Sequence, residues 1–168
     1  AVPGKYFAQM IATLTDPTIN LETKDTSLIL KTDGSTTKLV GMNADDFPDF
    51  PQFSEKTHEF SFDEFQEILQ RIAFSSSSDQ TRPILTGVLL SFEDTSTRVV
   101  ATDGFRLAIQ TTLINLGITE TMILPAKSLL DVFKSAEEEK VKTIEFSIST
   151  ELKQARFVVG PYTIFIRL

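Results

Sequence analysis

The sequence contains no cysteine among its 168 residues, which excludes disulfides, thiolate metal sites and cysteine nucleophiles. It has one histidine, His58, so no motif that needs paired histidines is possible. No apolar run approaches the roughly 20 residues of a membrane-spanning helix, and no signal-peptide pattern stands at the start of the chain. These absences are typical of a protein from a reducing compartment, and we expect a cytoplasmic location.

Motifs for catalysis are also missing. The chain has no glycine-rich phosphate loop and no Gly-x-Ser-x-Gly elbow. Tryptophan is absent, and the phenylalanines fall mostly at periodic core positions, so an aromatic platform for nucleic acid is not indicated. Asp103 could serve as a general base or a Mg²⁺ ligand, but its place before Gly104 is explained by a turn. We expect no catalytic residue, no metal and no cofactor.

The net charge of −7 counts against a protein that adheres to nucleic acid through its whole surface. A local basic face is still possible. The first expected helix carries Lys5 and no acid before Asp16, and the third carries Lys127 and Lys134 against Asp131. Neutral or basic helices in an acidic chain are what a phosphate-facing surface would need. The second expected helix is acidic and breaks this pattern.

One helix followed by three strands occurs three times along the chain. Apolar residues recur at helical spacing after Pro3, Ser61 and Pro125, so the expected helices begin near residues 4, 62 and 125. Alternating apolar residues and turn signals predict the strands. The expected strands are residues 19–22, 27–31, 36–42, 58–61, 84–92, 97–102, 105–111, 121–124, 144–149, 155–159 and 162–168, with a charged loop at 135–140.

The repeat predicts the domain organisation. Its period of about 60 residues is longer than that of solenoid repeats, and one such unit cannot bury both its sheet face and its helix stripe alone. We therefore expect an α+β fold with helices on a mostly antiparallel sheet. Residues 57–168 would form one domain and residues 1–56 the second half of a preceding domain, joined by the proline-rich connector Asn43–Lys56, with both chain ends looking cut. The alternative is an ordinary α+β domain with accidental spacing.

The stretch Thr81–Ala108 has the most distinctive composition. An apolar β-run is followed by a hairpin that we expect to turn at Asp103-Gly104, a dipeptide suited to positive φ. Arg82 and Arg106 would lie at strand edges beside apolar side chains. Cations paired with exposed apolar groups suit a site that grips a peptide. The alternative is a plain hairpin whose arginines are solvated.

The motifs TRPILTG (residues 81–87) and ATDGFRLA (101–108) resemble the middle domain of the bacterial sliding clamp, the beta subunit of DNA polymerase III. Supporting matches are Val2-Pro3, residues 44–48 and residues 124–127. The resemblance implies the DNA-clamp fold and a non-catalytic processivity factor. In this family a head-to-tail homodimer, with three domains per subunit, forms a ring around duplex DNA and tethers the polymerase III catalytic subunit, the clamp loader and other partners.

Carried over by position, the resemblance implies a pocket for a short, largely apolar partner peptide. The family often has histidine where this chain has Phe105, so the peptide preference could differ. Lys5 and Lys127 are the candidates for facing DNA. The implied pocket residues are Arg82, Leu85, Thr102, Gly104, Phe105, Arg106 and Leu107.

Two other hypotheses remain open from the sequence. One is a metal-dependent enzyme that uses Asp103 and neighbouring acids. The other is a peptide-binding module of similar architecture that has no part in replication.

Overall fold

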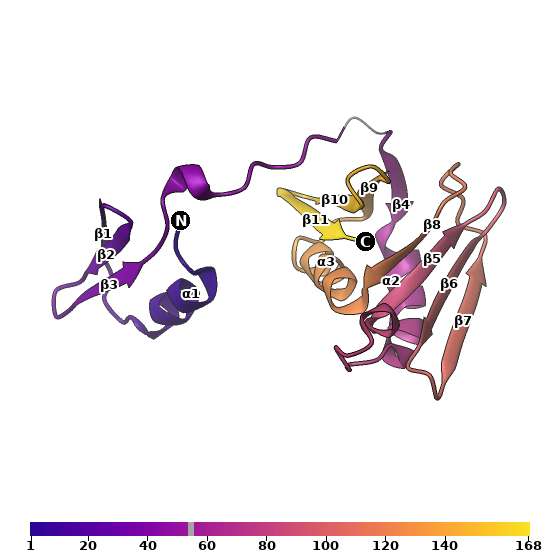
Figure 1. Cartoon of the computed structure of the whole chain (residues 1–168), viewed down its shortest axis with the longest axis horizontal. Helices are drawn as coiled ribbons and strands as arrows, with labels where there is room; N and C mark the ends of the chain where they lie inside the picture. The colour runs from indigo at the N-terminus through magenta and orange to yellow at the C-terminus, as the bar shows by residue number, and fades with distance from the viewer. Residues whose placement is uncertain (54–55) are drawn as a thin grey trace. The chain divides into compact units, whose positions relative to one another are not determined.

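The computed structural model describes residues 1–53 and 56–168 (Figure 1). Ser54 and Glu55, which belong to the expected connector, lie outside the described residues. The chain divides into two compact units, Ala1–Gln52 and Phe53–Leu168. Within the described residues, no helix is long and apolar enough to cross a membrane.

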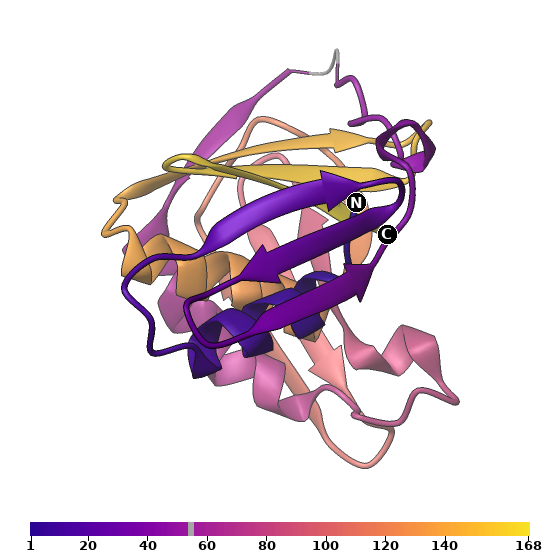
Figure 2. The same cartoon turned by 90° about the vertical axis from the view of Figure 1, so that its left-hand side faces the viewer.

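The first unit consists of one helix and one three-stranded sheet. The sheet is antiparallel with the order β1-β2-β3, and α1 lies along one face of it (Figure 2). The elements are α1 (Gly4–Thr13), β1 (Asn20–Lys24), β2 (Ser27–Lys31) and β3 (Thr36–Val40), followed by a 3₁₀ turn at Ala44–Asp46.

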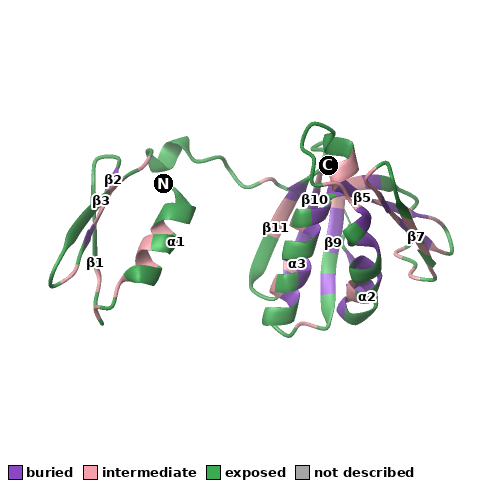
Figure 3. Cartoon of the chain, turned by 90° about the horizontal axis from the view of Figure 1, so that it is seen from below, coloured by how far each residue is buried: buried purple, intermediate pink, exposed green. Residues whose placement is uncertain are grey.

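Little of this first unit is buried. Leu30 is its one buried apolar residue among those described, and α1 has none; the unit is green and pink almost throughout in Figure 3. The expectation of a half-buried strand near residues 19–22 is wrong, because every residue of β1 is exposed and Leu21 is 55% exposed. One helix over three strands offers too little apolar surface to bury the sheet, as expected for a single helix-and-strand unit.

The second unit contains two helix-and-strand halves. Each half has one helix between a short strand and a run of three strands. The first half is β4 (His58–Ser61), α2 (Phe62–Ile72), β5 (Gly87–Phe92), β6 (Thr97–Thr102) and β7 (Leu107–Thr112); the second is β8 (Thr121–Pro125), α3 (Ala126–Glu138), β9 (Thr143–Ser149), β10 (Gln154–Val159) and β11 (Tyr162–Arg167).

The two halves exchange their first strands. All strand pairs are antiparallel, and the two four-stranded sheets have the orders β7-β6-β5-β8 and β11-β10-β9-β4. Thus β4 completes the sheet of the second half and β8 completes that of the first. Neither half therefore has a complete four-stranded sheet of its own strands. The arrangement confirms an α+β fold with helices packed on antiparallel sheets.

Phenylalanine rings join the halves in the core. The ring centroid of Phe133 on α3 lies 6.1 Å from Phe60, 5.9 Å from Phe62 and 5.5 Å from Phe65, all three from the first half. Phe133 is 3% exposed. Stacked aromatic pairs at these distances add to the stabilisation that burial provides. The core therefore lies between the halves.

Three expected boundaries are wrong, each for a local reason. Residues 84–86 belong to a 3₁₀ turn, Pro83–Thr86, which is closed by hydrogen bonds from the Leu85 N–H to the Arg82 carbonyl over 3.0 Å and from the Thr86 hydroxyl to the Pro83 carbonyl over 2.7 Å. The helix α3 continues through the expected loop at 135–140 as far as Glu138, because Ala136 is fully buried and anchors its last turn. Phe105 lies in the hairpin turn, not in a strand.

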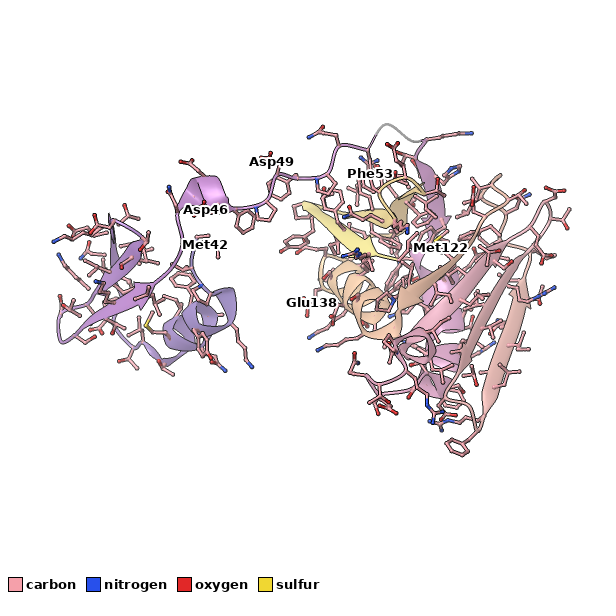
Figure 4. All side chains as sticks on the ribbon, in the orientation of Figure 1. Met42, Asp46, Asp49, Phe53, Met122 and Glu138 are labelled. Atoms are coloured by element: carbon pink, nitrogen blue, oxygen red, sulfur yellow. The ribbon has the colours of Figure 1, made fainter. Side chains whose placement is uncertain are left out.

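The first residue of the second unit, Phe53, packs against β10 and β11. The ring of Phe53, labelled in Figure 4, lies 5.6 Å from the ring of Phe165 on β11, centroid to centroid. The Arg156 guanidinium lies 5.6 Å from the centre of the Phe53 ring. The Arg156 guanidinium also donates to the hydroxyls of Ser147 and Thr57. This edge of the second unit is therefore held by an aromatic and a cation–π contact.

Candidate functional site

The turn between β6 and β7 is held by the carboxylate of Asp103. Its Oδ1 accepts hydrogen bonds from the backbone N–H groups of Phe105, over 2.9 Å, and Arg106, over 3.0 Å. Its Oδ2 accepts from Nε of Arg106 over 2.9 Å. The backbone hydrogen bond from Arg106 is the largest cause, and that from Phe105 the next largest, of a pKa of Asp103 below its ordinary value. Both oxygens are therefore engaged within the turn.

Thr102 and Gly104 complete the turn. The Thr102 hydroxyl accepts from the Gly104 N–H over 3.1 Å and donates to the Arg106 carbonyl over 2.7 Å. Gly104 has a φ of 93°, a backbone angle that residues other than glycine rarely adopt. These two residues shape the backbone from which the neighbouring side chains project.

Arg106 links the hairpin to the 3₁₀ turn Ala73–Ser75, which follows α2. Its Nη2 donates to the carbonyl of Phe74 over 2.9 Å, and its guanidinium carbon lies 5.3 Å from the centre of the Phe74 ring. Together with the bond to Asp103, these contacts occupy much of its donor capacity. Arg106 therefore positions the hairpin and presents only part of its guanidinium to solvent.

Unlike Arg106, Arg82 has a guanidinium group that is not engaged by other described residues. No ion pair and no side-chain hydrogen bond is found for its guanidinium within the described residues. A Cβ placed on Gly104 would lie 3.8 Å from its Nη1 and 4.0 Å from Cδ1 of Leu85, so both side chains flank the turn. A free guanidinium beside apolar groups can bind a carboxylate or a carbonyl.

The structure brings some of the expected site residues together and leaves others at the margin. Arg82, Phe105 and Arg106 line a hollow of about 270 Å³. Phe105 is 97% exposed. Leu107 begins β7 beside the hollow and is 61% exposed. Leu85 is half-buried within the 3₁₀ turn. The site is thus an open, shallow surface with two guanidinium groups and exposed apolar side chains.

Sequence reasoning missed one wall of the hollow. Ser76, Ser77, Ser78 and Asp79 line it, and none of them is among the expected site residues. Phe74 was likewise missed, although it is 59% exposed and packs on a guanidinium. An exposed aromatic residue just after an amphipathic helix was the available signal.

A larger groove adjoins the hollow. Its volume is about 1060 Å³, and it shares Ser76, Ser77 and Ser78 with the hollow. Its lining is mainly apolar and includes Ile84, Ile123 and Leu130. The serine run therefore separates a small cationic hollow from a large apolar groove.

The two expected DNA-facing lysines lie in different units. Lys5 is exposed on α1, and Lys127 is exposed in the first turn of α3, where it lines the groove. Three other cations on or beside the helices of the second unit are ion-paired: Arg71 with Glu67, Lys134 with Glu138 and Lys142 with Asp63. Lys5 and Lys127 have no ion pair within the described residues.

Nothing in this geometry supports an enzyme at Asp103. The described residues contain no cluster of three or more histidine, cysteine or acidic side chains that could hold a metal. A general base near neutral pH needs a raised carboxyl pKa, whereas that of Asp103 is lowered. The groups that the site presents are two guanidinium groups and exposed apolar side chains.

Comparison with known proteins identifies relatives of the whole arrangement. The sequence model of the DNA polymerase III beta subunit, central domain, matches residues 59–168. A beta sliding clamp of Chlamydia muridarum is 32% identical over 148 residues, which cover 85% of this chain and 40% of the relative. One of Helicobacter pylori strain J99 is 36% identical over 144 residues, covering 79% of this chain and 37% of the relative.

Solved structures agree with these matches. The Helicobacter pylori beta clamp bound to a DNA ligase peptide aligns with a TM-score of 0.78 and 28% identity, over 99% of this chain and 47% of that one. The DNA polymerase III beta subunit of Thermotoga maritima aligns with a TM-score of 0.77 and 24% identity, over 99% and 45%, and supports the fold alone. The chain spans about two fifths of the length of the curated relatives above.

Proposed function

The chain belongs to the family of DNA polymerase III beta subunits, the bacterial sliding clamps, and we propose that it acts as part of a processivity factor in DNA replication. The family is that of a non-catalytic polymerase subunit. The observation that carries the proposal is the match across residues 59–168, which includes the whole hairpin and its arginines. The protein would act in the cytoplasm.

The proposed mechanism is topological. In a longer protein, residues 1–56 would be the second half of one clamp domain and residues 57–168 the next domain of a head-to-tail homodimeric ring. Such a ring would encircle duplex DNA without reading its sequence. It would keep the polymerase III catalytic subunit on the template, since escape requires opening a protein interface. Loading would require a clamp loader.

Sparse cations suit a protein that must slide. Each lysine that neutralises a phosphate releases condensed counterions and adds to a salt-dependent affinity. The chain has a net charge of −7, and the ion pairs at Glu67 and Glu138 hold two of the helix cations. Lys5 and Lys127 are therefore the proposed contacts to DNA, few enough to let the ring move.

Lys127 offers a direct test in a ring-forming protein that contains this chain. Changing it to alanine should reduce the slope of log Kobs against log salt for DNA binding by about 1. Lys134→Ala is the matched control, because that ammonium lies 3.8 Å from Glu138 and is partly neutralised. Equal slopes for the Lys127 variant and the unaltered protein would remove Lys127 from the DNA-facing set.

The hairpin region would bind partner proteins through a short peptide. Arg82 would hold a polar or acidic group of the peptide, while Leu85, Phe105 and Leu107 would cover its apolar side chains. Each well-buried apolar side chain contributes roughly 1.5–3 kcal/mol. Arg106 would fix the hairpin in place. A relative that binds a DNA ligase peptide supports this proposal.

A labelled DNA ligase peptide of the kind bound by that relative tests the pocket by fluorescence anisotropy. We expect weak binding to the 168-residue chain, lowered about tenfold by Arg82→Ala through loss of a charge-assisted hydrogen bond and abolished by Leu107→Asp or Arg106→Ala. Arg71→Ala is the control, because Arg71 pairs with Glu67 on α2 and does not line the hollow. If the peptide bound neither this chain nor a longer protein containing it, the clamp function would be refuted.

A further inference from the structure

Asp79 and Asp103 occupy the same position relative to the two arginines of the hollow. Each aspartate stands three residues before its arginine, in the sequences Asp-Gln-Thr-Arg (79–82) and Asp-Gly-Phe-Arg (103–106). Both aspartates and both arginines line the hollow. Because Asp103 holds the turn that carries Arg106, the repeated spacing indicates a corresponding role for Asp79.

The carboxylate of Asp79 makes the same backbone hydrogen bond as that of Asp103. Its Oδ1 accepts from the N–H of the residue two positions later, Thr81, over 2.9 Å, the distance at which Asp103 accepts from Phe105. The Thr81 hydroxyl donates to the same oxygen over 2.8 Å. The bond from the Thr81 N–H is the largest cause, and that from its hydroxyl the next largest, of a pKa of Asp79 below its ordinary value. The ionised carboxylate therefore closes a turn over residues 79–82.

Further hydrogen bonds connect this turn to Arg82. The Arg82 N–H donates to the Asp79 carbonyl over 3.3 Å, and the Asp79 N–H donates to the hydroxyl of Ser77 over 3.0 Å. Arg82 directly follows Thr81, the residue that the carboxylate holds. The rotamers open to the Arg82 side chain depend on the backbone angles at this position, so the turn decides how the guanidinium is presented.

Leu85 is anchored separately from Asp79. Its carbonyl accepts from the Ser77 N–H over 2.8 Å, and its N–H donates to the Arg82 carbonyl over 3.0 Å. The bond between Ser77 and Leu85 joins two backbone groups and does not involve the carboxylate. Loss of the carboxylate should therefore disturb Arg82 more than Leu85.

The two turns differ in how they treat the guanidinium. Oδ2 of Asp103 accepts from Nε of Arg106, whereas no ion pair between Asp79 and Arg82 is found within the described residues. Asp79 thus holds the backbone before Arg82 and leaves its guanidinium able to bind a carboxylate or a carbonyl of another molecule.

We propose that Asp79 is a positioning residue of the peptide site, whose carboxylate orients Arg82 in the hollow without itself contacting the peptide. This inference rests on the proposed peptide-binding function and adds a residue to it. A side chain that is already ordered loses less conformational entropy on binding. Arg82 should therefore bind its partner group more tightly with the turn in place than without it.

Asparagine and alanine at position 79 separate the hydrogen bond from the charge. Both lack the negative charge, but the amide oxygen of asparagine can still accept from Thr81. With the labelled DNA ligase peptide in the anisotropy assay, we expect Asp79→Ala to bind about fivefold more weakly than Asp79→Asn, a part of the loss expected for Arg82→Ala. Asp79→Asn should bind at least as tightly as the unaltered chain. Asp63→Ala is the charge-matched control and should leave the affinity unchanged, because Asp63 pairs with Lys142 and does not line the hollow.

The same substitutions in an Arg82→Ala background test whether Asp79 acts through Arg82. There the alanine and asparagine variants should bind the peptide within about twofold of each other, because no guanidinium is left to orient. A general loss of stability would instead weaken binding in both backgrounds. In the free chain, NMR should show displaced amide signals of Thr81 and Arg82 for Asp79→Ala and nearly native ones for Asp79→Asn.

The outcomes distinguish the positioning role from the peptide site itself. If the unaltered chain binds the peptide and the alanine and asparagine variants bind it equally, the positioning role is refuted and the peptide site stands. A difference that persists in the Arg82→Ala background refutes the role in the same way. If the peptide binds neither this chain nor a longer protein containing it, the proposed function fails and the inference with it.

Discussion

Replacing Phe133 by alanine tests whether the second unit is held together by the contact between its halves. The ring is 3% exposed and lies within 6.1 Å of three rings from the other half, those of Phe60, Phe62 and Phe65. Removing a buried phenylalanine costs about 3–5 kcal/mol, because transfer energy is lost and a cavity remains. A domain of this size has only about 5–15 kcal/mol of unfolding free energy. Phe133→Ala should therefore remove a large part of the stability of the second unit.

Urea unfolding followed by far-ultraviolet circular dichroism measures this loss. With a slope of about 1.5 kcal/mol per molar urea, a loss of 3 kcal/mol lowers the midpoint by about 2 M. Phe50→Ala is the matched control, since the Phe50 side chain is 72% exposed and its removal should change the free energy by less than about 0.5 kcal/mol. Equal midpoints for the two variants would refute the view that the aromatic contacts join the halves.

Three further predictions concern the hairpin and its surroundings. Gly87→Ala should cost about 1–3 kcal/mol of unfolding free energy in the same assay, because the added Cβ would collide with the Ile123 side chain; an unchanged midpoint would contradict this. Gly104→Ala should cost about 1–2 kcal/mol, since its φ of 93° is unfavourable for alanine, and should weaken binding of the ligase peptide. The depressed pKa of Asp103 means that its stabilisation of the turn is fully present above the ordinary aspartate pKa, about 4, and is lost as the pH falls through the lower folded value. The change of the Phe105 amide shift with pH, measured by NMR, should therefore have its midpoint below the ordinary aspartate pKa; a midpoint at or above that ordinary value would refute the assignment.

Periodicity predicted the elements of the fold well because each helix and strand has its own apolar pattern. The helices begin at Gly4, Phe62 and Ala126, as the spacing indicates. The exchange of β4 and β8 between sheets was out of reach, since pairing partners depend on contacts far apart in sequence. Boundaries failed where local contacts decided them, as in the hydrogen-bonded 3₁₀ turn Pro83–Thr86, and at Ala136, whose burial extends a helix through charged residues.

The candidate site was predicted as a set of residues but not as a division of roles. Composition marks Arg82 and Arg106 as equivalent cations beside apolar groups. Only the structure shows that Arg106 is engaged by Asp103 and by the backbone and ring of Phe74, whereas Arg82 has no such partner within the described residues. Sequence could not show this, because the contact between Arg106 and Phe74 spans 32 positions.

This division of roles leads to different expected effects for the two arginines. Loss of Arg82 would remove the group that we propose to contact the peptide, so affinity should fall while the hairpin keeps its shape. Loss of Arg106 frees the hairpin from the end of α2 and leaves the Phe74 carbonyl without its donor. Affinity should then fall through displacement of Phe105 and Leu107, which the amide shifts of β7 would report before any peptide is added. On the proposed function, the hairpin would be a platform on which Arg106 fixes the position of the apolar groups and Arg82 would contact the partner.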